Sequence, residues 1–127
     1  YFFLKNSKIK HKIHFDIIGT GSLENELKNY VRENKIEQFI QFQGVKSRSD
    51  IVDFYSKADI LMFCSYFETL GLVAVEGIRY NLFIISSNRG ALPEVLFDYK
   101  RKEILEGLDF YSISEALTKY FENDQWA

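Results

Sequence analysis

The sequence predicts an α/β fold in which a parallel sheet carries helices on both faces. Short apolar runs rich in β-branched and aromatic residues alternate with stretches whose apolar residues recur every three or four positions. Two of the runs, residues 60–64 and 82–85, are uninterrupted, which is typical of parallel strands covered on both sides. Each connection between runs is long enough for the helical crossover that parallel strands need.

The first half of the chain predicts two strands, over residues 13–18 and 39–42, each followed by a helix. Ser22 is expected to cap the first helix, and Ser47 or Ser49 the second. The first helix has its apolar residues on one face, which we expect to be buried; they are Leu23, Leu27, Tyr30 and Val31.

The second half predicts three strands and three helices. The helix over residues 71–80 is nearly all apolar, so we expect a buried central helix with Leu72, Val75 and Ile78 facing inward. A capping box that begins at Ser112 is expected to start the last helix. The other predicted elements are the buried strands 60–64 and 82–85, a short helix over 91–96 and a weaker strand over 102–105.

Composition narrows the class of protein. A chain of 127 residues with 46% apolar residues suits one globular domain. The net charge of −2 argues against a nucleic-acid partner, because such partners usually bind strongly basic surfaces. A single cysteine, Cys64, excludes an intramolecular disulfide, suits a reducing compartment and is expected to be a core residue. His11 and His14 have no third ligand nearby, so we expect no metal site.

Ligands of parallel α/β sheets bind beyond the carboxyl ends of the strands, close to helix N-termini. Four predicted loops lie there, over residues 19–22, 44–49, 65–71 and 86–90. Gly19 and Gly21 can let the backbone approach a phosphate or can simply form a tight turn. Val45 can border a base, although the residues alone favour a simple turn. The loop around Arg89 fits contact with a phosphate or sugar as well as a solvated loop.

The segment from residue 65 to residue 76 holds two carboxylates among apolar neighbours. Glu68 lies at the tip of a predicted strand, and Glu76 lies eight residues later in the next helix. At about 3.6 residues per turn, eight residues amount to about 80° past two full turns, so Glu76 is expected near the ligand-side face but set deeper. A carboxylate among apolar residues needs hydrogen-bond partners, and sugar hydroxyls are suitable. The alternative is that Glu76 faces Arg79 at the end of the helix.

Taken in order, these segments resemble the C-terminal, nucleotide-sugar-binding domain of GT-B glycosyltransferases, specifically the retaining family 4 (group 1). The resemblance covers residues 12–121. Its most specific part is the pair Glu68 and Glu76, separated by seven residues and placed after Ala58-Asp59 and an apolar strand. The matching segments are residues 15–21, 40–45, 55–60, 65–77 and 87–95.

The resemblance implies a Rossmann-like sheet and a role for each matching residue. Glu68 is expected to be the catalytic residue beside the donor sugar and its leaving phosphate, and Glu76 to bind the ribose. The substrate-binding residues implied in this way are Gly19, Gly21, Val45, Thr69, Leu70, Gly71, Leu72 and Glu76; the backbone of residues 69–72 would hold the sugar and diphosphate, and Val45 and Leu72 would border the base. The family needs no cofactor and generally no metal, since protein groups neutralise the diphosphate.

The sequence also departs from the family. Its donor-binding domain begins with an additional strand, loop and helix, and that loop carries an Arg and a Lys that clamp the diphosphate. Residues 1–4 resemble the end of that helix, so we expect residues 1–127 to form a single, N-terminally truncated donor-binding domain that is inactive alone. The whole enzyme would transfer sugar to a glycan or lipid-linked acceptor held by an N-terminal domain. We expect a cytoplasmic location, with peripheral association at the inner face of the membrane.

Two other functions remain open at this point. Residues 16–22 resemble the glycine loop of S-adenosylmethionine-dependent methyltransferases. That class places an acidic residue at the end of the next strand, whereas the strand here ends in Gln43-Gly44. The aromatic residues at the start of the chain favour, more weakly, a non-enzymatic module that binds protein partners.

Overall fold

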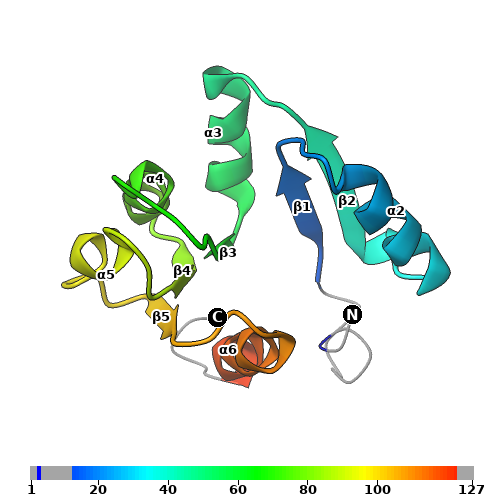
Figure 1. Ribbon diagram of the computed structural model, residues 1–127. Helices are drawn as coiled ribbons and strands as arrows, with labels where there is room; N and C mark the ends of the chain where they lie inside the picture. The colour runs from blue at the N-terminus through cyan, green and yellow to red at the C-terminus, as the bar shows by residue number, and fades with distance from the viewer. Residues whose placement is uncertain (1–2, 4–12, 123–127) are drawn as a thin grey trace. The chain divides into compact units, whose positions relative to one another are not determined.

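The computed structural model describes Phe3 and residues 13–122 (Figure 1). Strands and helices alternate along this part of the chain, and the strand pairs are parallel, so the predicted α/β class is confirmed. The helix end expected at residues 1–4 lies, apart from Phe3, outside the described residues. Among the helices of the described ranges, none is long and apolar enough to cross a membrane.

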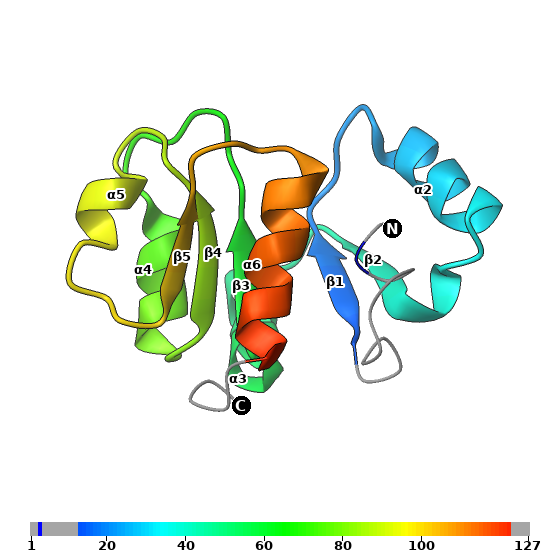
Figure 2. The ribbon, with the colours of Figure 1, turned by 90° about the horizontal axis from the view of Figure 1, so that it is seen from below.

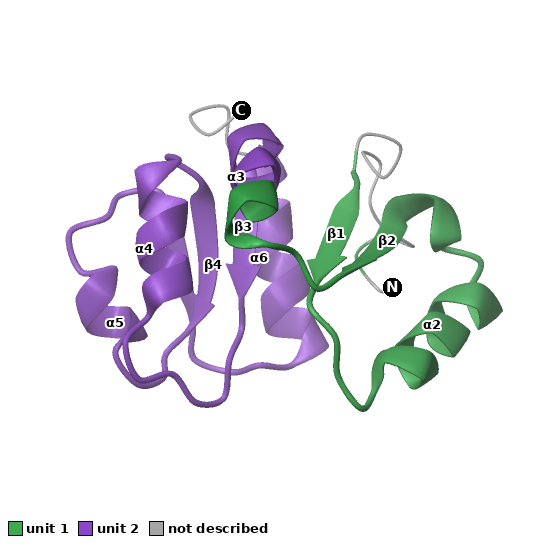
Figure 3. Ribbon diagram, turned by 90° about the horizontal axis from the view of Figure 1, so that it is seen from above, with its two compact units in different colours: residues 1–51 green, residues 52–127 purple. Residues whose placement is uncertain are grey.

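The chain divides into two compact units, residues 1–51 and 52–127, which are coloured separately in Figure 3. The boundary falls inside helix α3 (Arg48–Lys57). The strands form two separate sheets, one in each unit, where the sequence predicted one sheet. Each unit is described by itself below.

Unit 1 is a strand–helix–strand unit. Strand β1 (Phe15–Ile18) pairs in parallel with β2 (Ile40–Gly44), and helix α2 (Glu24–Glu33) with the 3-10 turn η2 (Glu37–Phe39) connects them. Directly after β1, the Gly19 amide donates to the carbonyl of Gly44, the last residue of β2, at 2.8 Å. The predicted strands and helix are therefore present, and both glycines lie at the carboxyl end of the pair.

The prediction that Ser22 caps the first helix is wrong. Helix α2 begins at Glu24 with Leu23, an apolar residue, at the N-cap. Glu24 and Glu26 lie in its first turn, where negative charge interacts favourably with the helix dipole. The expected buried face is also wrong in part: Val31 is buried, but three of its members are exposed, namely Leu23, Leu27 and Tyr30. An apolar helix face is buried only where another element covers it, which periodicity alone cannot show.

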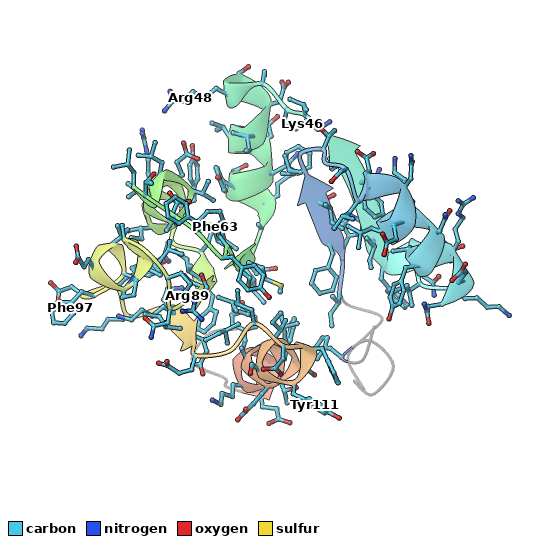
Figure 4. All side chains as sticks on the ribbon, in the orientation of Figure 1. Lys46, Arg48, Phe63, Arg89, Phe97 and Tyr111 are labelled. Atoms are coloured by element: carbon cyan, nitrogen blue, oxygen red, sulfur yellow. The ribbon has the colours of Figure 1, made fainter. Side chains whose placement is uncertain are left out.

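Helix α3 is capped by Ser47, the first of the two predicted alternatives. The Ser47 hydroxyl accepts a hydrogen bond from the Asp50 amide at 3.1 Å, which satisfies one of the free N–H groups of the first turn. Lys46 and Arg48 lie at this end of the helix (Figure 4).

Unit 2 is a three-stranded parallel sheet in the order β3-β4-β5. Helices α4 and α5 lie on one face and α6 on the other, as Figures 1 and 2 show from two directions. The elements are β3 (Ile60–Phe63), α4 (Leu72–Arg79), β4 (Phe83–Ser87), α5 (Leu92–Val95), β5 (Lys102–Leu105) and α6 (Phe110–Glu122). These bounds confirm the six predicted elements to within a few residues.

The core of unit 2 lies between β4 and the helices α4 and α5. Its fully buried members are Ala74, Ile84, Leu92 and Leu96. All five residues of β4 are buried, whereas β3 is only half-buried, so the expected complete burial of residues 60–64, Cys64 included, is wrong. The reason is topological, because β3 is an edge strand and β4 is the central one.

Helix α4 is buried on one face only, and the prediction that Leu72 and Val75 face inward is wrong. Ala74 and Gly77 face the sheet, whereas Leu72 and Val75 are exposed. A Cβ atom added at Gly77 would lie 2.5 Å from the side chain of Leu61, so the glycine allows the close approach of α4 to β3.

The last helix begins two residues before the predicted capping box. The Asp109 carboxylate accepts hydrogen bonds from the amides of Tyr111 and Ser112 and from the Ser112 hydroxyl, at 2.9, 3.0 and 2.8 Å. These bonds lower the pKa of Asp109. Ser112 is therefore not the N-cap, because a charged carboxylate three residues earlier binds the free N–H groups more strongly.

Candidate functional site

Two loops of unit 2 leave the same end of the sheet and run side by side (Figure 2). They follow β3 and β4, at the carboxyl ends where the sequence predicted a site. The Ser87 hydroxyl donates to the Ser65 carbonyl at 2.6 Å, and the Ala91 amide donates to the Glu68 carbonyl at 3.3 Å. The Ser65 hydroxyl in turn donates to the Phe67 carbonyl at 2.7 Å. These bonds hold the β3–α4 loop against the β4–α5 loop.

Gly90 lies where the backbones of the two loops approach closely. Its φ angle is +55°, and a Cβ atom built on it would lie 1.8 Å from the Glu68 carbonyl oxygen. Any other residue would push the two backbones apart. The position of Glu68 therefore depends on a glycine 22 residues later in the chain.

The Glu68 side chain turns back onto its own loop. Its Oε1 atom accepts hydrogen bonds from the amides of Gly71, at 2.9 Å, and Leu70, at 3.0 Å. These bonds, the one from Gly71 first, lower the pKa of Glu68, so the side chain is a carboxylate at neutral pH. Two of the backbone N–H groups predicted to hold the donor thus donate to Glu68, immediately before helix α4.

Glu76 is half-buried in the second turn of α4 and has a tyrosine partner. The Tyr55 hydroxyl donates to Glu76 Oε2 at 2.9 Å, and the Tyr55 ring stacks on Tyr80 with centroids 5.5 Å apart. Tyr55 itself is only 6% exposed. Burial, followed by the bond to Glu76 and its negative charge, raises the pKa of Tyr55, so the phenol remains protonated.

The rim of the site is apolar and open to solvent. Leu72, which follows Gly71 at the start of α4, is 61% exposed, and Leu70 and Thr69 are also exposed. Tyr66 and Phe67, directly before Glu68, are 79% and 80% exposed. Exposed apolar side chains therefore flank Glu68 along the chain.

The other three predicted site residues belong to unit 1. Added Cβ atoms at Gly19 and Gly21 would meet nothing within 4 Å, so the backbone there is open to close approach. Val45 is 75% exposed and follows Gly44. Their predicted contacts with a nucleotide stay predictions.

Several further residues were considered from sequence. Arg89 is exposed between β4 and α5 (Figure 4), and both of its interpretations remain open. Burial raises the pKa of the Cys64 thiol, which is the opposite of what a nucleophilic cysteine needs. Within Phe3 and residues 13–122, no three His, Cys, Asp or Glu side chains gather in a way that could hold a metal ion.

Sequence reasoning missed the contribution of Tyr55, and it considered Gly90 and Ser87 only as loop residues. Tyr55 was expected only as an inward residue of its helix, because its bond to Glu76 joins positions 21 residues apart. Gly90, a glycine in a loop of otherwise polar residues, indicated that the backbone there approaches another group closely. The sequence did not indicate that this group is the Glu68 carbonyl.

Comparison with known proteins shows the family of the chain. Residues 3–126 match the family model of glycosyl transferases group 1. The chain is 28% identical over 112 residues to an uncharacterized glycosyltransferase of Methanocaldococcus jannaschii, covering 88% of this chain and 32% of that protein. It is 27% identical over 99 residues to the D-inositol 3-phosphate glycosyltransferase of Corynebacterium kroppenstedtii, covering 78% and 22%.

Solved structures show the same fold. WaaG, a glycosyltransferase involved in lipopolysaccharide biosynthesis, matches with a TM-score of 0.80 and 16% identity over 93% of this chain and 31% of that one. Sucrose-phosphate synthase from Thermosynechococcus elongatus matches with a TM-score of 0.76 and 20% identity over 88% and 30%. The chain thus spans about a third or less of the proteins it matches. Because the family model covers almost the whole sequence, the chain belongs to the group 1 glycosyltransferases.

Proposed function

We propose that this chain is the donor-binding part of a retaining family 4 glycosyltransferase that moves a sugar from a nucleoside diphosphate to a glycan or lipid-linked acceptor. The observation that carries the proposal is the pair Glu68 and Glu76. Glu68 lies in the loop directly before α4 and Glu76 lies in the second turn of α4, and each has a defined hydrogen-bond partner. Because the chain belongs to the group 1 glycosyltransferases, sugar transfer is the reaction in which we expect these two carboxylates to act.

The donor sugar and diphosphate would lie over the start of α4. A helix N-terminus carries partial positive charge and backbone N–H groups, which favour a phosphate. Glu68 holds the loop in shape through Leu70 and Gly71, so the remaining acceptor capacity of its carboxylate would face the sugar hydroxyls. The exposed Leu72 side chain would border the base.

The transfer step would exchange one glycosidic bond for another on the same face of the sugar. The bond between the anomeric carbon and the diphosphate oxygen breaks, and its electron pair leaves with the diphosphate. The acceptor hydroxyl oxygen forms the new bond, and its proton passes to the departing diphosphate. Protein groups stabilising the charge that develops on the diphosphate would accelerate the step electrostatically, without a metal ion.

Isothermal titration calorimetry of the 127-residue chain with UDP and GDP tests the donor site. We expect measurable binding of one of them. Glu76→Gln should weaken that binding about tenfold, the loss expected for one hydrogen bond to a charged group.

Glu115→Gln is the matched control, because Glu115 is an exposed glutamate on α6, on the opposite face of the sheet. It should leave nucleotide affinity unchanged. Equal affinities for the wild type and Glu76→Gln would remove the ribose contact from the proposal.

A further inference from the structure

We propose that Tyr55 is a positioning residue that orients the Glu76 carboxylate toward the ribose of the donor. The inference rests on the proposed function, since it assumes that Glu76 binds ribose. Its geometric basis is the 2.9 Å hydrogen bond from the Tyr55 hydroxyl to Glu76 Oε2. This bond ties a residue of α3 to a residue of α4, and both belong to unit 2.

The position of the hydroxyl is set by packing. The Tyr55 ring is 6% exposed, and it lies against Tyr80 at 5.5 Å with an interplanar angle of 22°. Tyr80 follows the last residue of α4, so the ring is held by the same helix that carries Glu76. A buried and stacked tyrosine has few alternative rotamers, and its hydroxyl is therefore a fixed donor.

The chemistry of the pair suits a binding role. A carboxylate accepts hydrogen bonds only, and each of its oxygens has two lone-pair sites, so accepting from Tyr55 leaves capacity for a ribose hydroxyl. The raised pKa of Tyr55 keeps the phenol a donor over the whole working pH range. A carboxylate held in one orientation before the ligand arrives loses less conformational entropy on binding.

The competing explanation is that the bond only joins α3 to α4. Both explanations predict lower stability when the hydroxyl is removed. They differ in ligand discrimination, because only an oriented Glu76 would distinguish a nucleotide with ribose hydroxyls from one without them. The test therefore compares UDP with 2′,3′-dideoxy-UDP, with GDP and its dideoxy form measured in parallel.

In the 127-residue chain we expect the ribonucleotide to bind about tenfold more tightly than its dideoxy form, a ratio that corresponds to about 1.4 kcal/mol. In Tyr55→Phe, which keeps the ring, the ratio should fall to about twofold or less while the affinity for the dideoxy form stays unchanged. Adding Tyr55→Phe to Glu76→Gln should change the ratio no further, since both act on one contact.

Tyr99→Phe is the matched control. It removes another tyrosine hydroxyl of unit 2, one that donates to the Leu82 carbonyl, and it should keep the full ratio despite a similar loss of stability. If Tyr55→Phe does not fold, Tyr80→Leu removes the stacking ring but leaves the Tyr55 hydroxyl, and its ratio should fall below that of the wild type.

The outcomes separate the two proposals. A Tyr55→Phe or Tyr80→Leu variant that keeps the wild-type ratio, while Glu76→Gln loses it, overturns the positioning role and leaves the donor site standing. A wild type that binds both forms equally, or neither, overturns the ribose role of Glu76 and with it the role of Tyr55.

Discussion

The two compact units are built on the same strand–helix–strand plan, yet they bury their strands very differently. In unit 2 every residue of β4 is buried, and Ile84 is 0% exposed. In unit 1 the equivalent apolar residues of β1 stay open, with Ile17 at 38% and Ile18 at 36%. A central strand with neighbours on both edges and helices on both faces is fully covered, whereas a two-stranded pair is not.

The difference matters for the proposed site. Glu68 and Glu76 are held by elements that pack on the buried core of unit 2, and binding groups on a rigid support keep their geometry. Gly19, Gly21 and Val45 lie at the end of a strand pair whose side chains are half-exposed. We therefore expect substitutions in unit 2 to have larger effects than chemically matched substitutions in unit 1.

The largest contrast should come from removing the same side chain in the two sheets. Ile84→Ala should lower the free energy of unfolding of unit 2 by about 3–5 kcal/mol, from lost burial and the cavity left behind. Ile17→Ala should cost less than about 1 kcal/mol, because that side chain is already partly in water. Native-state hydrogen exchange of the β4 and β1 amides measures each unit separately. Similar losses in the two variants would contradict the comparison.

A second contrast uses the loop glycines. Gly90→Ala should destabilise unit 2 by about 1–3 kcal/mol, because its Cβ would collide with the Glu68 carbonyl and φ is positive. Gly21→Ala in unit 1 should change stability by no more than about 0.5 kcal/mol, since its Cβ meets no atom. Urea unfolding curves give both values. A stable Gly90→Ala variant with unchanged nucleotide affinity would show that the two loops need not touch.

A third contrast concerns the caps of the helices. Asp109→Ala should lower the melting temperature by roughly 2–5 °C, because three hydrogen bonds at the start of α6 are lost. Ser22→Ala should leave it unchanged, since α2 begins after Leu23 and Ser22 is not its N-cap. Differential scanning calorimetry checks both. A drop for Ser22→Ala as large as that for Asp109→Ala would restore the capping role that the sequence predicted.

The smallest effect should be a loss of stability at acid pH that is caused by two carboxyl groups of unit 2. The folded pKa values of Glu68 and Asp109 lie below their ordinary values of 4.5 and 3.8. A carboxyl group whose pKa is lower in the folded protein than in the unfolded chain stabilises the fold at pH values above its ordinary pKa. That stabilisation is lost as the pH falls through the pKa of the folded protein. The melting temperature measured between pH 7 and pH 3 should therefore fall less steeply in Glu68→Gln and Asp109→Asn. Parallel curves for wild type and variants would refute this.

Much of the fold could be predicted because hydrophobic periodicity is a local signal. The strand over Lys102–Leu105 has the predicted bounds, and α5 forms around Pro93 as expected. The position of Glu68 before α4 also followed from local patterns, an apolar run and then a glycine at the helix start. The apolar periodicity of a segment therefore predicts the secondary structure of that same segment.

The remainder depended on contacts between distant residues. The predicted caps at Ser22 and Ser112 were wrong, because the N-cap of α2 is Leu23, one residue later, and the start of α6 is capped by Asp109, three residues earlier. The burial of β3 depended on its place at the sheet edge, which an apolar run does not encode.

The sequence by itself therefore determined the order of strands and helices, the parallel α/β class and the spacing of Glu68 and Glu76 around the start of α4. These are properties of short segments, set by side-chain pattern and backbone preference. Only the tertiary structure decided that Gly90 lies against the Glu68 carbonyl and that Tyr55 holds Glu76, because each contact joins segments more than twenty residues apart. Such pairings form only when a common core brings the segments together.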